Sequence, residues 1–281
     1  MTPDPARLAA AARSHRLRFE DVECFWREWG AGPPVVLVHG GTGSWLHWVR
    51  NIDGLAASYR VLVPDMAGFG DSSDAPAGFG AAGQARLLRA GLRELVGTAA
   101  RPALVGFSFG AIVSGLVAAE VPVRGLMLVG AVGLDIDRGP PLPMRAWKHL
   151  DDAQAVDRAH RHNLCTLMLA HDESVDALAM AVQRHNAGAA RFYSKRSSHS
   201  AALAEALPRV AAPVGGIWGS EDVTAARDPL RVAARLSALR PDASLDIIRG
   251  AGHWVQFEAS SSFDAACLRW LAGLAGTTRS Q

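Results

Sequence analysis

The sequence has few cysteines and none of the spacings that hold a metal. Cys24, Cys165 and Cys267 lie far apart and are odd in number, and no CxxC or Cys/His metal spacing occurs. A disulfide framework or a structural metal site is therefore not expected, and a reduced, cytoplasmic setting is the simplest interpretation. We expect no metal ion and no cofactor.

The sequence also lacks a dense basic tract. Its formal net charge is +2 at pH 7, so nucleic acid or an anionic membrane surface is not implied as a partner. Residues 1–18 contain four arginines and no continuous apolar run, which does not resemble a secretory signal. The uncharged segment 102–119 is long enough to span a bilayer, but its glycines, serines and proline fit a strand, a sharp turn and a buried helix better.

Apolar composition and strand patterning predict a soluble globular enzyme. Of the 281 residues, 49% are hydrophobic and 20% are charged. Segments rich in β-branched residues alternate with helical ones, which predicts an α/β fold with a mostly parallel twisted sheet flanked by helices. The expected strands are a pair within 17–29, then 35–39, 59–64, 103–107, 125–132, 214–218 and 244–249. The last helix is expected to begin near Ser262.

Strand patterns stop between Leu134 and Leu207. Helical periodicity there predicts helices over 146–169 and 174–185, with Asp172 as a helix N-cap. We therefore expect an α/β core of 1–134 and 208–281 and a helical cap of 135–207 inserted between strands. Such a cap would cover the carboxyl ends of the strands, where open α/β sheets bind ligands.

A G-x-S-x-G motif follows a predicted strand directly and precedes a predicted helix. It comprises residues 106–110, with Ser108 at its centre. A serine at such a strand-to-helix turn projects its hydroxyl above the sheet as a nucleophile. The alternative is a glycine-rich helix start with a capping serine, but the preceding strands favour a nucleophile elbow.

A serine hydroxyl is a weak nucleophile unless a base is within reach and an acid orients that base. On an α/β sheet with this elbow the chain order is serine, acid, histidine. Asp222 follows the predicted strand 214–218, and His253 follows the predicted strand 244–249. We predict a catalytic triad of Ser108, Asp222 and His253. For the acid alone, the sequence leaves three alternatives, which are Glu221, Asp135 and Asp137.

The loop His39–Gly43 follows another predicted strand and contains three glycines. Backbone N–H groups of Gly41 and Phe109 are predicted to form an oxyanion hole. A phosphate-binding loop is the alternative, but the loop lacks G-x-G-x-x-G and a P-loop lysine.

Five segments occur in an order that resembles the α/β-hydrolase fold superfamily over nearly the whole chain. They are HGGTGSW (39–45), PDMAGFGDS (64–72), GFSFG (106–110), GSED (219–222) and GAGHW (250–254). Within the superfamily the chain resembles the serine-nucleophile branch near meta-cleavage product (C–C bond) hydrolases, enol-lactonases and related esterases. The residues that carry this resemblance are Trp254, the GFGDS loop, and Trp48 with Asn51.

The resemblance carries one departure. C–C hydrolases usually have asparagine before the nucleophile, where this sequence has Phe107. They also use a cap arginine on the substrate carboxylate, for which Arg191 is the nearest candidate. Epoxide hydrolases and haloalkane dehalogenases of similar outline use an aspartate nucleophile, so Ser108 disfavours both.

The expected function is hydrolysis of a carboxylic ester or lactone of a medium-sized apolar substrate through an acyl-enzyme. The alternatives are a C–C bond hydrolase of the meta-cleavage type and a ligand receptor or cofactor-free oxygenase on the same fold. The expected partner is a small-molecule substrate, and a homodimer remains open as the assembly. The candidate substrate-binding residues are Trp45, Phe107, Trp147, Arg191 and Trp254.

Overall fold

The computed structural model describes residues 4–137 and 139–274. Its centre is one eight-stranded sheet in the order β1-β2-β4-β3-β5-β6-β7-β8. Strand β2 pairs antiparallel with β1 and β4, and all other neighbours pair in parallel. The strands are β1 Arg13–Phe19, β2 Val22–Trp29, β3 Pro34–Val38, β4 Arg60–Pro64, β5 Ala103–Phe107, β6 Gly125–Val129, β7 Val214–Gly219 and β8 Ser244–Ile248. The predicted α/β fold class is confirmed.

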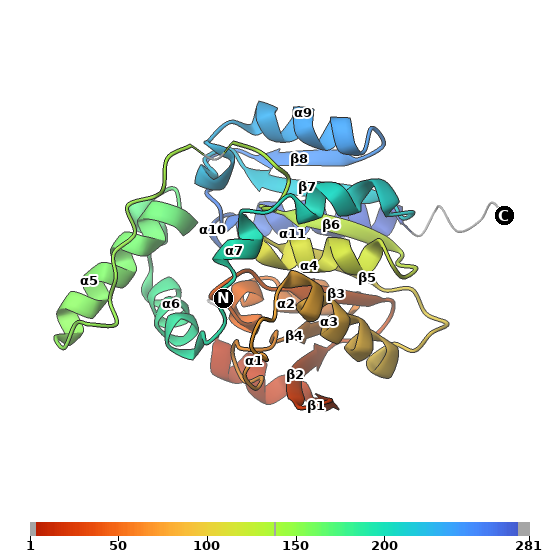
Figure 1. Cartoon of the computed structure of the whole chain (residues 1–281), viewed down its shortest axis with the longest axis horizontal. Helices are drawn as coiled ribbons and strands as arrows, with labels where there is room; N and C mark the ends of the chain where they lie inside the picture. Colours follow the sequence, from red (N-terminus) through yellow and green to blue (C-terminus); the bar gives the residue numbers. More distant parts are fainter. Residues whose placement is uncertain (1–3, 138, 275–281) are drawn as a thin grey trace.

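Helices cover both faces of the sheet (Figure 1). Alternate residues of β3 show why, because Val35 and Leu37 belong to one buried cluster, whereas Val36 and Val38 belong to the other. A strand buried on both faces needs a continuous apolar sequence, which is the pattern that made these strands predictable. The helices outside the β6–β7 connection are α1 Pro5–Ala11, α2 Ile52–Ala56, α3 Ala81–Leu95, α4 Phe109–Ala118, α9 Pro229–Leu239, α10 Val255–Glu258 and α11 Ser260–Gly273.

The connection from β6 to β7 is helical, as predicted, but its helices begin later than expected. They are α5 Ala153–Asn163, a π-helical turn Leu164–Met168, α6 Ala177–Ala189, α7 Lys195–Ser198 and α8 Ala202–Ala206. Helix α5 begins only at Ala153 because Asp152 caps it, accepting from Gln154 N–H at 3.1 Å and from Ala155 N–H at 2.9 Å. The Asn163 side chain holds the segment before α5 through hydrogen bonds to both backbone groups of Arg145, at 2.7 and 2.9 Å. The predicted N-cap at Asp172 is wrong, since Asp176 caps α6 by accepting from Ala179 N–H at 2.8 Å.

Of the inserted helices, α5 and α6 lie beyond the carboxyl end of the sheet (Figure 1), whereas α8 packs against α4. Three backbone hydrogen bonds attach the insertion to loops that follow the strands: Trp254 N–H to Met168 O at 2.7 Å, Arg191 N–H to Gly68 O at 2.8 Å and Ala204 N–H to Gly133 O at 2.9 Å. None of the described helices has the length and apolar character needed to cross a bilayer. The division into a core and a separate cap at residues 135–207 stays a prediction.

Candidate active site

Ser108 lies at a sharp turn between β5 and α4. Its backbone adopts φ 52° and ψ −115°, a conformation that costs free energy for a residue with a side chain and is typical of a nucleophile elbow. The flanking glycines permit the turn. A Cβ on Gly106 would lie 2.6 Å from Ala111 Cα, and one on Gly110 would collide with the Val38 carbonyl oxygen. The motif therefore brings the start of α4 against β3 and β5.

The structure brings Ser108, His253 and Asp222 together from loops that follow β5, β8 and β7. His253 Nε2 lies 3.0 Å from Ser108 Oγ, and His253 Nδ1 lies 3.0 Å from Asp222 Oδ2 and 3.1 Å from Oδ1. With the proton on Nδ1, the imidazole donates to the carboxylate and Nε2 accepts from the serine hydroxyl. This is the geometry that proton transfer from the serine requires.

Asp222 is 1% exposed, and Thr224 completes its surroundings. The backbone N–H and the hydroxyl of Thr224 both donate to Asp222 Oδ1 at 2.8 Å. Burial alone would raise the pKa of the Asp222 carboxyl, but the charge of His253 and hydrogen bonds from His253 and Thr224 outweigh it and lower that pKa. The carboxylate thus stays ionised beside the imidazole.

The three alternative acids lie elsewhere. Glu221 accepts a hydrogen bond from its neighbour's hydroxyl at 3.0 Å. Asp135 pairs with Arg235 at 3.3 Å and is 69% exposed in its side chain, and Asp137 lies 3.8 Å from Arg231 and is 83% exposed. None of these carboxylates contacts His253 among the described interactions, so the geometry favours Asp222 as the acid.

The two predicted oxyanion-hole residues lie side by side. A Cβ on Gly41 would be 3.8 Å from Phe109 Cβ. Gly40 N–H is already used, because it donates to His47 Nδ1 at 3.2 Å. In the described part of the chain, neither Gly41 N–H nor Phe109 N–H donates to another group, so both are available to a substrate oxygen.

Three residues that surround this site were not predicted from the sequence. Besides Thr224, Ser194 places its hydroxyl where a Cβ of Gly41 would be, which brings the insertion to the loop His39–Gly43. His47 is 3% exposed, and its ring lies 5.3 Å from that of Phe107. Burial lowers the pKa of His47 well below its ordinary value, and charge on His39 or His253 would lower it further. His47 is therefore neutral, and its Nδ1 is the acceptor that holds the loop His39–Gly43 through Gly40 N–H.

Two of the aromatic residues predicted to bind substrate support the site from within the core. Phe107 is 1% exposed, and its ring centre lies 5.0 Å from that of His253. Trp254, also 1% exposed, stacks on Phe257 at 4.0 Å and donates from Nε1 to His47 O at 2.9 Å. These contacts hold the histidine loop and leave little of either ring available to a substrate.

The other predicted substrate-binding residues have no described contact with the three central residues. Trp45 packs against Trp29 at 5.8 Å and under the Arg27 guanidinium at 4.9 Å. Trp147 lies on the insertion, 4.8 Å from the His160 ring.

Arg191 directs its guanidinium at the carboxylate of Asp74 and the carbonyl oxygens of Ser72 and Ala189. Its predicted role, to bind a substrate carboxylate, would need these contacts to break.

A family model described as "Alpha/beta hydrolase family" matches residues 35–265. That range includes the serine, acid and histidine loops.

Curated relatives include hydrolases that are named for dienoate substrates. The chain is 30% identical over 261 residues to a 2-hydroxy-6-oxo-6-phenylhexa-2,4-dienoate hydrolase of Burkholderia cepacia, covering 86% of this chain and 89% of that protein. It is 30% identical over 247 residues to a 2-hydroxy-6-oxo-2,4-heptadienoate hydrolase of Pseudomonas putida, covering 83% and 87%. A magnesium-chelatase 30 kDa subunit of Rhodobacter capsulatus is 31% identical over 258 residues, covering 86% and 88%.

Solved structures of similar fold include esterases. An esterase from Rhodococcus sp. ECU1013 superposes with a TM-score of 0.76 at 21% identity, covering 94% of this chain and 99% of that one. A thermophilic esterase from Thermogutta terrifontis gives a TM-score of 0.65 at 21% identity, covering 94% and 98%. At these identities the likeness concerns the fold.

Proposed function

Because the chain belongs to the alpha/beta hydrolase family, a family of hydrolases, we propose that it is a serine hydrolase of carboxylic esters or lactones. The observation that supports this most strongly is the continuous hydrogen-bond chain from Ser108 Oγ through the His253 imidazole to Asp222, with 3.0 Å at each step. Such a chain serves the removal of a proton from a hydroxyl during nucleophilic attack.

In the first half of the proposed reaction, His253 Nε2 takes the Ser108 proton as Oγ attacks the substrate carbonyl carbon. The carbonyl oxygen becomes an oxyanion, which Gly41 and Phe109 N–H groups stabilise at a few kcal/mol per donor. Asp222 stabilises the imidazolium. His253 then gives its proton to the leaving alcohol, and the acyl group remains on Ser108.

In the second half, His253 takes a proton from a water molecule, and the resulting hydroxide attacks the acyl-enzyme. Collapse of the tetrahedral intermediate returns the proton to Ser108 and releases the carboxylic acid. We assign residues 135–207 as the cap that covers this step, since Ser194 contacts Gly41 and exclusion of water strengthens electrostatic interactions inside a site.

An apolar substrate is supported by the surroundings of the site. Phe109 and Phe192 lie 5.9 Å apart between α4 and the insertion. The nearest predicted carboxylate-binding group, Arg191, is engaged by Asp74. A substrate without a free carboxylate therefore fits these residues better than one that carries it.

C–C bond hydrolysis is the second candidate. It is favoured by the relatives at 30% identity, which are named for dienoate substrates. It is disfavoured by Phe107 at the position before the nucleophile and by the ion pair of Arg191.

The thiols fit the reducing compartment that we propose. Cys24, Cys165 and Cys267 are all free. Burial raises the pKa of Cys24 to about 12 and that of Cys165 to about 11, so these thiols stay protonated and poorly reactive. Three free thiols are compatible with a cytoplasmic enzyme that acts on a small molecule.

The test is hydrolysis of p-nitrophenyl acetate and butyrate by the native protein, by Ser108→Ala and by Ser262→Ala, an exposed serine of α11, as matched control. We expect turnover by the native protein and the control, and none above background by Ser108→Ala. Ester hydrolysis that survives in Ser108→Ala would refute the serine mechanism.

A second substrate distinguishes the candidates. The native protein is offered p-nitrophenyl butyrate and 2-hydroxy-6-oxo-6-phenylhexa-2,4-dienoate under identical conditions. A higher kcat/KM for the ester supports an esterase, and a higher value for the dienoate supports the C–C hydrolase. If the protein turns over neither substrate but binds an apolar ligand tightly, the result supports a ligand receptor. If it turns over neither substrate but consumes oxygen, the result supports a cofactor-free oxygenase.

A further inference from the structure

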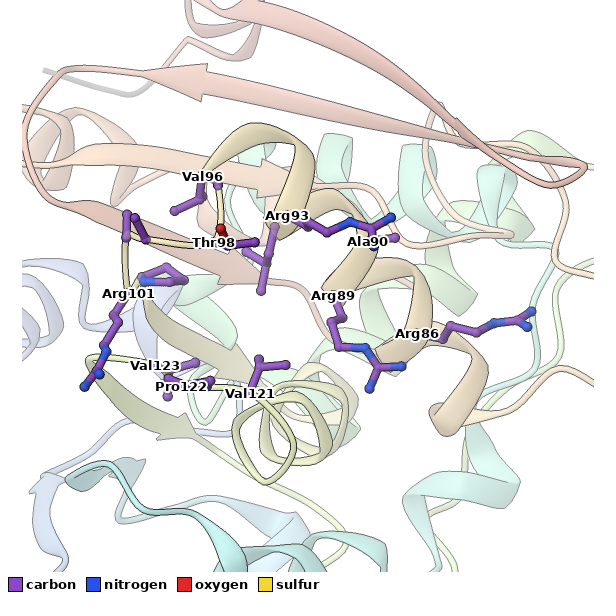
Figure 2. A pocket seen from close by; sticks show the side chains of 15 residues that line it. Arg86, Arg89, Ala90, Arg93, Val96, Thr98, Arg101, Val121, Pro122 and Val123 are labelled. Atoms are coloured by element: carbon purple, nitrogen blue, oxygen red, sulfur yellow. The ribbon is translucent and has the colours of Figure 1, made fainter.

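A cavity of about 600 Å³ lies at the opposite end of the sheet from Ser108, near the starts of β5 and β6 (Figure 2). Its walls are the second half of α3, the loop 96–102 that leads into β5, and the loop 121–123 that follows α4. The volume falls within the range of about 300–1,000 Å³ that small-molecule sites occupy. None of the residues that form the proposed reaction site lines this cavity.

The cavity has an arginine rim, which comprises Arg86, Arg89, Arg93 and Arg101. Figure 2 shows Arg101 on one side of the hollow and the three arginines of α3 on the other, with the side chains of Arg93 and Arg101 extending away from each other. Two of the four are neutralised, because Arg86 pairs with Glu20 at 3.4 Å and Arg89 pairs with Glu120.

Arg93 and Arg101 are exposed. Within residues 4–137 and 139–274, neither forms an ion pair or a side-chain hydrogen bond. The rim thus carries two uncompensated positive charges.

The floor of the cavity is apolar. Leu92 and Val123 are each 6% exposed, and Val96, Pro102 and Val121 lie beside them. In Figure 2, Val121 and Val123 lie on one side of this apolar lining and Val96 lies on the other side. A ligand that filled this space would remove apolar surface from water, which favours binding.

We propose that this cavity binds a small amphiphilic anion, with its apolar body inside the cavity and its acidic headgroup at the rim, paired with the exposed guanidinium groups of Arg93 and Arg101. Medium-chain carboxylates are the ligand class that fits best, because the site offers unpaired guanidinium groups at the rim and aliphatic side chains below. A sugar phosphate would leave its hydroxyl groups unpaired on this floor. The site does not depend on the proposed hydrolytic reaction.

A flat polyanion or an anionic membrane fits less well. Those partners are recognised by many basic side chains on one open face, whereas here two unpaired cations flank a concave hollow. The position of the cavity is also informative: α4 begins beside Ser108 and ends at Ala118, three residues before the loop 121–123. A bound anion would therefore contact the segment that follows the nucleophile helix.

The experiment is isothermal titration calorimetry of the native protein with decanoate, decyl phosphate, decanol and inorganic phosphate. We expect both amphiphilic anions to bind, decanol to bind at least about tenfold more weakly, and inorganic phosphate to give no measurable heat at the same concentrations. Equal binding of decanol and decanoate would overturn the role of the arginines. No binding of either anion at millimolar concentration would overturn the site.

Variants locate the binding. Arg93→Gln/Arg101→Gln removes the headgroup contacts, and Ala90→Phe fills the cavity without a change in charge. Each is expected to weaken decanoate binding at least about tenfold. The matched control, Arg158→Gln/Arg269→Gln, removes two other exposed positive charges (side chains 64% and 65% exposed) and is expected to change binding less than twofold.

Thermal melting checks that every variant is folded. A folded Ala90→Phe that binds decanoate like the native protein would overturn the proposal, and so would an equal loss of affinity in the control.

Discussion

The two ends of the sheet differ in how their charged groups are satisfied. At the carboxyl end, Asp222 and His253 are 1% and 3% exposed and bond to each other at 3.0 Å. At the amino end, Arg93 and Arg101 are exposed at the rim of a cavity. Buried charges persist only with partners, whereas exposed charges need none. Each group at the carboxyl end therefore depends on the others, whereas Arg93 and Arg101 are charges independent of each other.

The largest expected effect is at the histidine. His253→Ala removes the base and should lower kcat for p-nitrophenyl butyrate about 10⁴-fold or more. His185→Ala, an exposed histidine of α6, is the control and should leave kcat within about twofold. Steady-state kinetics on purified, folded variants measures both. A loss below tenfold in His253→Ala would mean that the carboxyl end does not act as a coupled unit.

Replacement of the acid should have the next largest effect. Asp222→Asn leaves the shape in place but removes the charge that stabilises the imidazolium, and we expect kcat to fall about 10³- to 10⁴-fold. Asp135→Asn and Asp137→Asn, compared in the same assay, should stay within about twofold of the native value. A larger loss in either of them than in Asp222→Asn would move the acid to the loop after β6.

A smaller effect is expected at Thr224, which touches the carboxylate and not the serine. Thr224→Val removes one of the two 2.8 Å hydrogen bonds to Asp222 Oδ1 and keeps the backbone one. We expect kcat to fall about tenfold with little change in KM. Thr224→Ser, which keeps the hydroxyl, should restore the native kcat. Failure of serine to restore it would assign Thr224 a packing role only.

The half-buried carboxyl of Asp264 offers a comparison with Asp222, which accepts hydrogen bonds from His253 and Thr224. Asp264 accepts from Asn51 Nδ2 at 2.8 Å, and burial raises its pKa to about 6 from an ordinary 3.8. Because folding favours its protonated form, its contribution to stability is complete below pH 4 and is lost as pH rises through 6.

Asp264→Asn should therefore increase the free energy of unfolding at pH 8 by about 1–2 kcal/mol, and this gain should vanish near pH 4. Urea denaturation at both pH values measures it. Asp246→Asn, a carboxylate 46% exposed, should show no such pH dependence. A destabilised Asp264→Asn at pH 8 would contradict the assignment.

The smallest effect is expected at the amino end. Arg93→Gln/Arg101→Gln should leave the kcat for ester hydrolysis within about twofold of native and the free energy of unfolding within about 0.5 kcal/mol. The same kinetic and urea assays apply. A large loss of basal activity would show that the two ends are not independent in the absence of a ligand.

The sequence predicts the sheet well because its central strands are buried on both faces. Strand β5 was predicted at its observed bounds, and β6 and β7 differ only at their ends. Chain order and strand ends were also sufficient to bring Ser108, Asp222 and His253 to one end of the sheet, since the carboxyl ends of parallel strands meet there. The family resemblance, carried by the same motifs, is confirmed by the family match.

What the sequence could not predict depends on contacts between distant segments. The stretch before α5 is held by the Asn163 side chain, which hydrogen-bonds to the backbone N–H and carbonyl oxygen of Arg145, 18 residues earlier. The surface position of the Arg191 guanidinium follows from Asp74, which lies 117 residues earlier. Ser194 reaches Gly41 only because the insertion folds back over the sheet. Periodicity reports which face of an element is apolar, but it does not report which other segment will cover that face.

The central claim is that Ser108 is a nucleophile activated by His253. The most direct measurement is mass spectrometry of the native protein after reaction with an alkyl fluorophosphonate, followed by peptide mapping. The account predicts one phosphonyl adduct per chain, located on Ser108, absent from Ser108→Ala and at least about 10²-fold slower to form in His253→Ala. An adduct on another residue, or labelling that proceeds equally fast without His253, would contradict it.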